Sequence, residues 1–274
     1  MIQFGKYLPS PDLRPYIHSF WTMSAAANPA FQDTTIRLVP DGYLEWTFHL
    51  EGLTDFRFHS SGNSPRFKSH FVGHFTNHLD MNFPAEGFLI FSIKFHPWTG
   101  HLFWDSAMKS YTNVIVDLWS DGSRDKRELI EAVHESRSNE ARIEKVETWL
   151  RKQLSVTPDQ QLKQLCTGLL TTEAGFKVDD LLEDANLSKR RLEQIFAEKV
   201  GLPPKSIHRI HRIRRVIDHM KARPGDSLTT VAHEYNFFDQ SHFNREFKRF
   251  TGFAPKRFFH HLNPVTGLVN FKID

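Results

Sequence analysis

The chain has 274 residues, of which 39% are apolar and 13% aromatic. This composition excludes a largely disordered protein, and the longest apolar run, Phe88 to Phe91, is far shorter than the roughly 20 residues of a membrane helix. The net charge is +3, but residues 1–170 carry 17 Lys and Arg against 19 Asp and Glu, whereas residues 171–274 carry 18 against 13. We therefore expect any phosphate-binding surface in the C-terminal part.

Residues 1–119 are rich in Phe, His, Gly and Pro and contain short alternating runs, such as 44–50 and 88–95. Alternation with a period of two, bounded by turn residues, predicts β-strands. Because no long helical pattern separates the strands, a small barrel or sandwich is expected. The aromatic candidates for a pocket inside it are Trp46, Phe48, Phe91 and Phe95, although a role in the plain core is favoured.

After Asp121 the pattern changes to apolar residues three and four apart, which predicts helices over residues 125–154. Such a helix either connects domains or forms a dimer, or else it covers an open face of the strand domain. Ser155 then offers an N-cap, and Pro158 suits the first turn of a helix from about Pro158 to Leu170. We place a domain boundary there, between an N-terminal domain at 1–154 and a C-terminal domain at 155–274.

An internal repeat with an offset of 51 residues occupies the last third of the chain. Its first copy contains Leu192, Phe196, Gly201, Pro204 and Lys205, and its second contains Phe243, Phe247, Gly252, Pro255 and Lys256. Each copy has the outline of a short helix, a turn and a second helix, as in helix-turn-helix DNA-binding proteins.

In the first copy Val178, Leu181 and Leu182 form one apolar face, residues 185–187 make the turn, and Ser188 caps the next helix. The second copy repeats that face as Leu228, Val231 and Ala232, with one residue inserted in the turn and with Asn236 at a left-handed position. The apolar stripe of the second helix, which we assign to the core, consists of Phe237, Phe243, Phe247 and Phe250.

The outward residues of the two second helices are the candidate DNA contacts. In the first copy they are Lys189, Arg190, Glu193 and Gln194. In the second copy they are Gln240, Ser241, His242, Asn244, Arg245 and Lys248, together with Asp239. Arg pairs with guanine and Gln with adenine in the major groove, so these residue types suit base recognition. Since the outward residues of the copies differ, we expect an asymmetric binding site with two unlike halves.

Between the copies, apolar residues from Ile207 to Met220 predict one long helix that ends before 223–225. A helix of this length spans about 25 to 28 Å, which suits two recognition helices about one DNA turn apart. Its basic residues are expected in part to reach phosphate and in part to pair locally; they are Lys205, Arg209, Arg212, Arg214 and Arg215.

Residues 188–259 resemble the DNA-binding domain of the AraC/XylS family of bacterial transcription regulators. The matching positions are 187–192, Phe196, Gly201, 204–205, 212–213, 231–232, 236–249 and 251–255. Asn236 replaces a usual Gly and Val216 a usual Ala. The resemblance implies two recognition helices in successive major grooves of promoter DNA, contact with RNA polymerase, activation of transcription and an N-terminal regulatory domain.

Residues 1–150 are more weakly similar to an uncharacterised sensor domain of some members, through 38–42, 72–74 and 93–97. This similarity implies a cupin-like barrel. The expected fold is therefore an α+β multidomain chain: a β-rich cupin-like barrel with following helices, then an all-α domain with two helix-turn-helix motifs joined by a long helix.

The expected protein is a cytoplasmic, nucleoid-associated regulator that binds double-stranded DNA, responds to a small molecule or partner and forms a homodimer. The alternative is a metal-binding cupin-like enzyme domain fused to a DNA-binding module, resting on His49, His59, His70, His74, His78 and His96. Two His one residue apart followed by Glu, the familiar barrel-metal arrangement, are absent, so we expect no catalytic residue, metal or other cofactor. The lone Cys166 is expected to be a buried core thiol.

Overall fold

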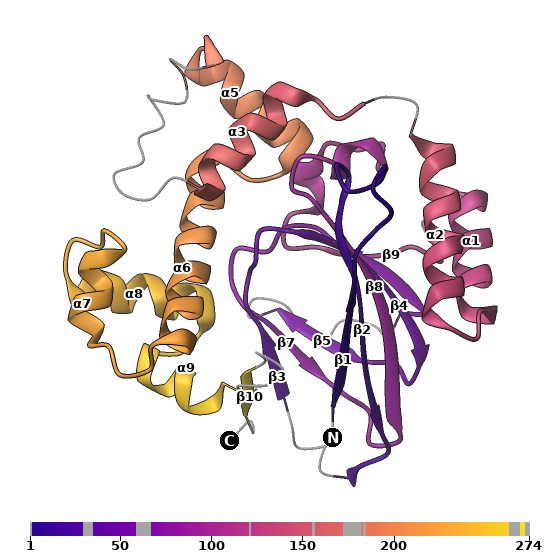
Figure 1. Ribbon diagram of the computed structural model, residues 1–274, viewed down its shortest axis with the longest axis horizontal. Helices are drawn as coiled ribbons and strands as arrows, with labels where there is room; N and C mark the ends of the chain where they lie inside the picture. Colours follow the sequence, from indigo (N-terminus) through magenta and orange to yellow (C-terminus); the bar gives the residue numbers. More distant parts are fainter. Residues whose placement is uncertain are drawn as a thin grey trace.

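Two β-sheets followed by helices form an α+β chain, as the sequence predicts (Figure 1). The computed structural model describes residues 2–29, 35–58, 67–120, 122–154, 157–171, 182, 185–262 and 269–271. Within these ranges, none of the helices combines the length and apolarity that crossing a membrane requires.

The N-terminal part forms a six-stranded and a four-stranded antiparallel sheet, and the second of these gains one strand from the C-terminal residues. The first has the order β1 (Gln3–Tyr7), β2 (Ile17–Ala26), β8 (Gly87–Phe95), β4 (Leu44–Glu51), β6 (Ser69–Val72) and β9 (Ile115–Asp117). The second has the order β10 (Val269–Phe271), β3 (Thr35–Leu38), β7 (Leu79–Asn82) and β5 (Asp55–Phe58). The two alternating runs of the sequence are the adjacent strands β4 and β8.

Two helices, α1 (Arg124–Glu135) and α2 (Asn139–Gln153), cover one face of the six-stranded sheet. Val133, Val146 and Leu150 share a buried cluster with Trp46 and other strand residues. This arrangement confirms the interpretation in which the helices cover an open face of the strand domain. In Figure 1 they lie on the opposite side of the sheets from the C-terminal helices.

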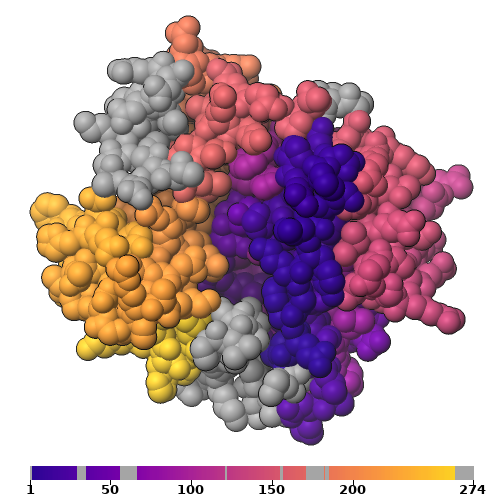
Figure 2. Space-filling view, in the orientation of Figure 1, coloured from indigo at the N-terminus to yellow at the C-terminus, as the bar shows by residue number. Residues whose placement is uncertain are grey.

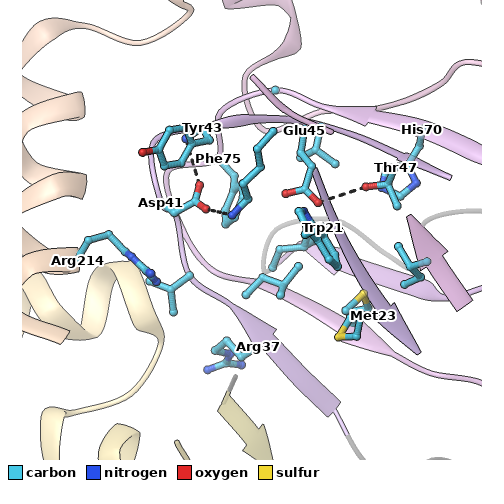
Figure 3. A pocket seen from close by; sticks show the side chains of 18 of the residues that line it. Trp21, Met23, Arg37, Asp41, Tyr43, Glu45, Thr47, His70, Phe75 and Arg214 are labelled. Atoms are coloured by element: carbon cyan, nitrogen blue, oxygen red, sulfur yellow. Dashed lines mark hydrogen bonds and ion pairs between the residues drawn. The ribbon is translucent and has the colours of Figure 1, made fainter. Parts of the chain in front are cut away.

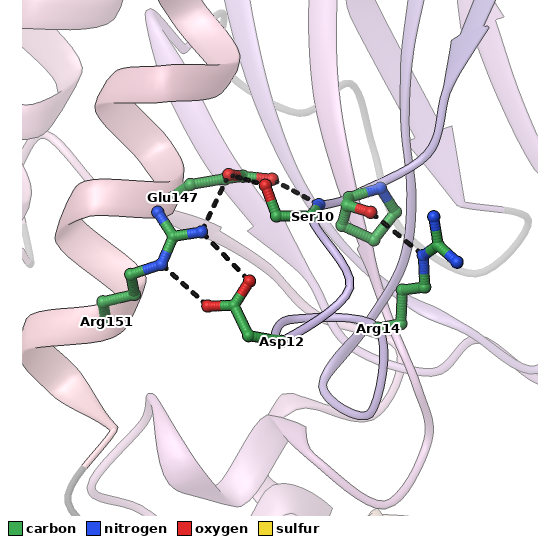
Figure 4. A network of polar contacts seen from close by, with 6 residues as sticks. Ser10, Asp12, Arg14, Glu147 and Arg151 are labelled. Carbon is green, nitrogen blue, oxygen red and sulfur yellow. Dashed lines mark hydrogen bonds and ion pairs between the residues drawn. The ribbon is translucent and has the colours of Figure 1, made fainter.

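A polar network ties α2 to the loop between β1 and β2 (Figure 4). The Ser10 backbone N–H and hydroxyl donate to the two carboxylate oxygens of Glu147, at 2.7 and 2.6 Å. Arg151 donates to both oxygens of Asp12, at 2.8 and 3.1 Å, and also to Glu147, at 3.2 Å. The chain up to the end of α2 is therefore joined to the sheets by packing and by hydrogen bonds.

The C-terminal part consists of helices around a separate buried cluster. They are α3 (Gln160–Thr171), α5 (Lys189–Ile195), the single π-helical turn η4 (Phe196–Val200), α6 (Pro204–Ala222), α7 (Leu228–Glu234), α8 (Gln240–Thr251) and α9 (Pro255–His261). The long helix predicted between the copies is α6. Of the first copy's apolar face, Val178 and Leu181 lie outside the described residues, as does Ser155.

The first of these helices, α3, begins two residues later than predicted. The Asp159 carboxylate accepts a hydrogen bond from the Leu162 backbone N–H at 3.0 Å, which is the contact of a helix N-cap. Pro158 therefore precedes the helix. Cys166 is fully buried in the cluster, and burial raises the pKa of its thiol, so the predicted role as a core residue is confirmed.

The two copies of the repeat share their backbone conformation as well as their core. Asn186 and Asn236 are both left-handed, with φ of 50° and 55°, which short polar side chains tolerate. Ser188 caps α5 and Asp239 caps α8, each through its side chain. The offset is 50 residues for the asparagines and 51 for the caps, so the inserted residue lies between them. The predicted core stripe is confirmed, since Phe237, Phe243, Phe247 and Phe250 are all buried.

Candidate nucleic-acid interface and interdomain cavity

The predicted contact residues of the first copy form one exposed surface on α5. Lys189, Arg190, Glu193 and Gln194 are all exposed. Gln194 is already hydrogen-bonded within its own helix, because its Nε2 donates to Glu198 at 2.9 Å and its Oε1 accepts from Arg191 at 3.2 Å. These bonds orient the amide and use one of its two N–H donors and one of its two acceptor sites, so a base can pair with the others.

The predicted contact residues of the second copy are divided between an open face and the turn. Gln240, Ser241, Arg245 and Lys248 are exposed, whereas His242 and Asn244 are half-buried. The Thr229 hydroxyl donates to Gln240 Oε1 at 3.0 Å, so a residue of α7 orients this candidate base contact.

His242 holds the turn before α8. Its Nδ1 accepts from the Phe238 backbone N–H at 3.3 Å, and its ring lies 5.7 Å from that of Phe237 at an angle of 71°. The Asp239 carboxylate accepts from the His242 backbone N–H at 2.6 Å. The structure thus gives His242 a positioning role that spacing alone did not indicate.

A carboxylate from α8 joins the recognition helix to α6. Glu246 is only 6% exposed; Arg209 Nε donates to its Oε1 at 2.7 Å, and Arg212 Nη2 donates to its Oε2. Burial by itself raises the pKa of Glu246, but the hydrogen bonds and charges of the two arginines outweigh it, so the pKa lies below its ordinary value. These two arginines pair locally, as was expected for part of the basic residues on α6.

The N-terminal part contacts each copy of the repeat at the C-terminal end of its second helix. The Thr112 hydroxyl donates to the Gly201 carbonyl at 2.8 Å, directly after the first recognition helix. At the end of the second, Arg37 Nη1 donates to the Thr251 carbonyl at 3.4 Å, and its guanidinium lies 4.3 Å from the centre of the Phe253 ring. Figure 2 shows the C-terminal helices seated beside the strands.

A cavity of about 260 Å³ opens where the two parts meet (Figure 3). Most of its wall comes from the strands, but Arg214 and Ile217 of α6 and Phe258 of α9 also line it. A molecule bound there therefore touches both the N-terminal sheets and the C-terminal helices.

Charged groups form one side of this cavity. Lys94 is paired with Asp41, whose Oδ1 also accepts from the Tyr43 backbone N–H at 3.1 Å. Burial raises the pKa of Asp41, but the charges of Lys94 and Arg214 lower it by more. The pKa therefore lies below its ordinary value, and this carboxyl is ionised near pH 7. Glu45 lies beside the pair, and burial raises its pKa to about 7 even though the Thr47 hydroxyl donates to it at 3.3 Å.

The rest of the wall is mainly apolar and includes one unsatisfied donor. Trp21, Met23, Phe75 and Ile90 line it. Trp21 Nε1 is buried and has no hydrogen-bond partner among the residues that the structure describes. An unpaired buried donor of this kind is unfavourable.

The four aromatic residues suggested as pocket candidates do not line this cavity. Trp46, Phe48, Phe91 and Phe95 are buried in the cluster beneath α1 and α2, so the alternative role as plain core is confirmed for them. The reason is the alternation of β4, which places Glu45 and Thr47 on the cavity face and the aromatic neighbours on the other. The polar residues within this run are the feature of the sequence that marks the cavity face, and it was missed in favour of the aromatic residues.

Two of the histidines proposed as metal ligands, His49 and His70, lie side by side. His49 Nε2 lies 3.1 Å from His70 Nδ1, and both rings are buried. Burial lowers the pKa of His49 to about 4 and that of His70 well below its ordinary value, so both are neutral near pH 7. Within the described ranges, which omit His59, no group of three or more residues is suited to hold a metal ion.

Comparisons with known proteins match each part of the chain separately. Residues 181–261 match a family model described as a helix-turn-helix domain, and residues 5–117 match a domain of unknown function, DUF6597. No curated protein matches.

Among solved structures, the chain is similar to ToxT from Vibrio cholerae, at 13% identity and a TM-score of 0.46 over 94% of this chain and 97% of that one. It is also similar to an ethanolamine utilization protein, EutQ, from Salmonella typhimurium, at 10% identity and a TM-score of 0.25 over 34% of this chain and 68% of that one.

Proposed function

We propose that this DNA-binding transcriptional regulator, whose C-terminal domain is a helix-turn-helix domain of the AraC type, binds an asymmetric operator and responds to a small molecule in its interdomain cavity. The regulatory domain spans 1–154 and the DNA-binding domain 155–274. Separate buried clusters support this division, since the cluster beneath α1 and α2 ends at Leu154, whereas the cluster of the C-terminal helices draws mainly on later residues.

The observation that supports base recognition is a pair of capped helices in corresponding parts of the repeat, each with an exposed polar face. The N-terminal residues of a recognition helix meet base edges in the major groove. The contact residues are Lys189, Arg190, Glu193, Gln194, Gln240, Ser241, Asn244, Arg245 and Lys248, with His242 holding the turn.

Replacing Arg245 by alanine should weaken operator binding by about 1 to 3 kcal/mol and relax the preference at one base pair, because Arg donates two hydrogen bonds to guanine. Binding isotherms on the operator and on single-base variants measure both effects. Gln194→Ala should act in the same way in the other half of the operator.

Arg249→Ala is the matched control, because Arg249 lies on α8, is exposed and is absent from the proposed contact set. It should leave base preference unchanged. Equal weakening of Arg245→Ala on every DNA sequence would show that Arg245 contacts phosphate instead of a base.

The cavity supports the effector proposal because one ligand there touches both domains. A ligand can shift an equilibrium between arrangements only if it binds them with different affinity, and a site shared by β4, α6 and α9 meets that condition whenever the domains move. The expected ligand has an apolar body for the wall at Trp21 and Ile90 and a hydrogen-bonding end for Glu45.

Thermal unfolding with a library of small metabolites should identify compounds that raise Tm through this cavity. For a compound that donates a hydrogen bond to the Glu45 carboxylate, affinity should rise with pH through about 7, the pKa of that carboxyl. One pH unit below the pKa, the affinity should be roughly tenfold weaker than at high pH, where the carboxyl is fully ionised. Glu45→Gln should abolish this pH dependence, whereas Glu51→Gln, at the exposed end of the same strand, should preserve it. A pH profile unaffected by Glu45→Gln would place the ligand elsewhere.

The proposed output is activation through contact with RNA polymerase, by a nucleoid-associated homodimer in the cytoplasm. The helices α1 and α2 use one face to cover the sheet, and their remaining exposed faces are available for a second copy.

A further inference from the structure

One large apolar side chain projects into solvent beside the second recognition helix. Phe238 is 89% exposed, the highest value among the exposed large apolar residues in the part of the chain that the structure describes. It directly precedes Asp239, the N-cap of α8. Isolated exposed apolar residues are common, so exposure alone does not indicate a function.

Phe238 is the residue that the second copy has gained. In the first copy one residue, Leu187, separates the left-handed Asn186 from the cap Ser188, and it packs against the C-terminal core. In the second copy Phe237 takes that buried place, and Phe238 has no counterpart. The scaffold of the repeat therefore does not require this side chain.

The backbone at Phe238 is held in place although its ring is not. Its N–H donates to His242 Nδ1, and the Asp239 carboxylate accepts from the His242 N–H. The ring is thus presented from a fixed turn at the N-terminal end of α8, the end that faces base edges in a major groove. Because the backbone is already ordered at this turn, only the side-chain torsions of Phe238 lose freedom on binding.

We propose that the Phe238 ring packs on the 5-methyl group of a thymine next to the bases that α8 contacts, an inference that rests on the DNA-binding function proposed above. Phe is one of the side chains that make apolar contact with the thymine methyl group. Phe238 lies two positions before Gln240, the first residue of α8, and both residues are exposed. Phe238 then specifies one base pair without any hydrogen bond.

The test uses the full-length protein and an operator selected by it from random DNA. Each thymine is replaced in turn by deoxyuridine, which removes only the methyl group. The wild type should lose about fourfold in affinity at one thymine, the size expected for burying one methyl group. Phe238→Ser should bind more weakly than the wild type and show no further loss at that position, with an unchanged Tm because the ring is exposed.

Leu8→Ser is the matched control, since Leu8 is 68% exposed but lies in the N-terminal part; it should retain the full deoxyuridine effect. If the wild type tolerates deoxyuridine everywhere, or Phe238→Ser loses as much as the wild type, the thymine contact is wrong while base recognition through Arg245 still stands. Loss of activation by Phe238→Ser with unchanged DNA affinity would assign the ring to RNA polymerase instead. Failure to select any operator would contradict the DNA-binding proposal itself.

Discussion

Replacing Glu246 by alanine is expected to destabilise the protein by about 3 kcal/mol, because it leaves two guanidinium groups side by side without their shared carboxylate. Glu246 is 6% exposed, and its partners Arg209 and Arg212 both come from α6. The contact fixes the angle between the second recognition helix and the long helix, so operator affinity should fall as well. Chemical denaturation and binding isotherms measure the two effects.

The pH dependence of unfolding tests whether the charge of Glu246 causes this stabilisation. Since the arginines lower the folded pKa of Glu246 below its ordinary value, the contribution is complete above that value and is lost as pH falls through the folded pKa. The difference in unfolding free energy between wild type and Glu246→Gln should therefore shrink as pH falls below the ordinary value of 4.5 and through the lower folded pKa. Glu193→Gln, on the exposed face of α5, should leave both stability and its pH profile unchanged; a constant difference at all pH values would indicate that packing, and not charge, is lost.

The C-terminal domain could be predicted from sequence because its signals are local. Core positions such as Phe196 and Phe247 recur at helical spacing. The caps Ser188 and Asp239 each lie within four residues of the backbone N–H group from which they accept a hydrogen bond. The left-handed Asn236 was likewise identified from its place in the turn. Interactions between neighbours in sequence leave patterns in the sequence itself.

The cavity could not be located in this way, because alternation shows that a strand has two faces but not what covers each one. The aromatic face of β4 at Trp46 and Phe48 proved to be covered by α1 and α2, and the face with Glu45 looks toward the C-terminal domain. The same limit applies to Arg37, which contacts Thr251 from 214 positions away. It also applies to β10, whose pairing with β3 joins the end of the chain to an N-terminal sheet.

Replacing Gly201 by alanine is expected to cost about 3 kcal/mol of folding stability, part of it for a left-handed residue with a side chain and the rest for a collision with backbone. Gly201 has φ of 97°, and a Cβ there would lie 2.7 Å from the Met108 carbonyl oxygen, which cannot move without displacing the chain around it. Thermal and chemical unfolding of the full chain measure the loss. Gly225→Ala is the control, since its Cβ would meet nothing within 4 Å.

The corresponding glycine of the second copy makes this a test of how the two domains are coupled. Gly252 has φ of 75°, but a Cβ there would meet side-chain atoms of Arg37 and His78 instead of backbone, so Gly252→Ala should cost less than Gly201→Ala. If the N-terminal domain restrains both copies through its contacts at Gly201 and Gly252, both variants should change operator affinity in the same direction. Gly225→Ala should leave operator affinity unchanged. Opposite directions would mean that the regulatory domain restrains one recognition helix and supports the other, and the two halves of the operator would then respond differently to the effector.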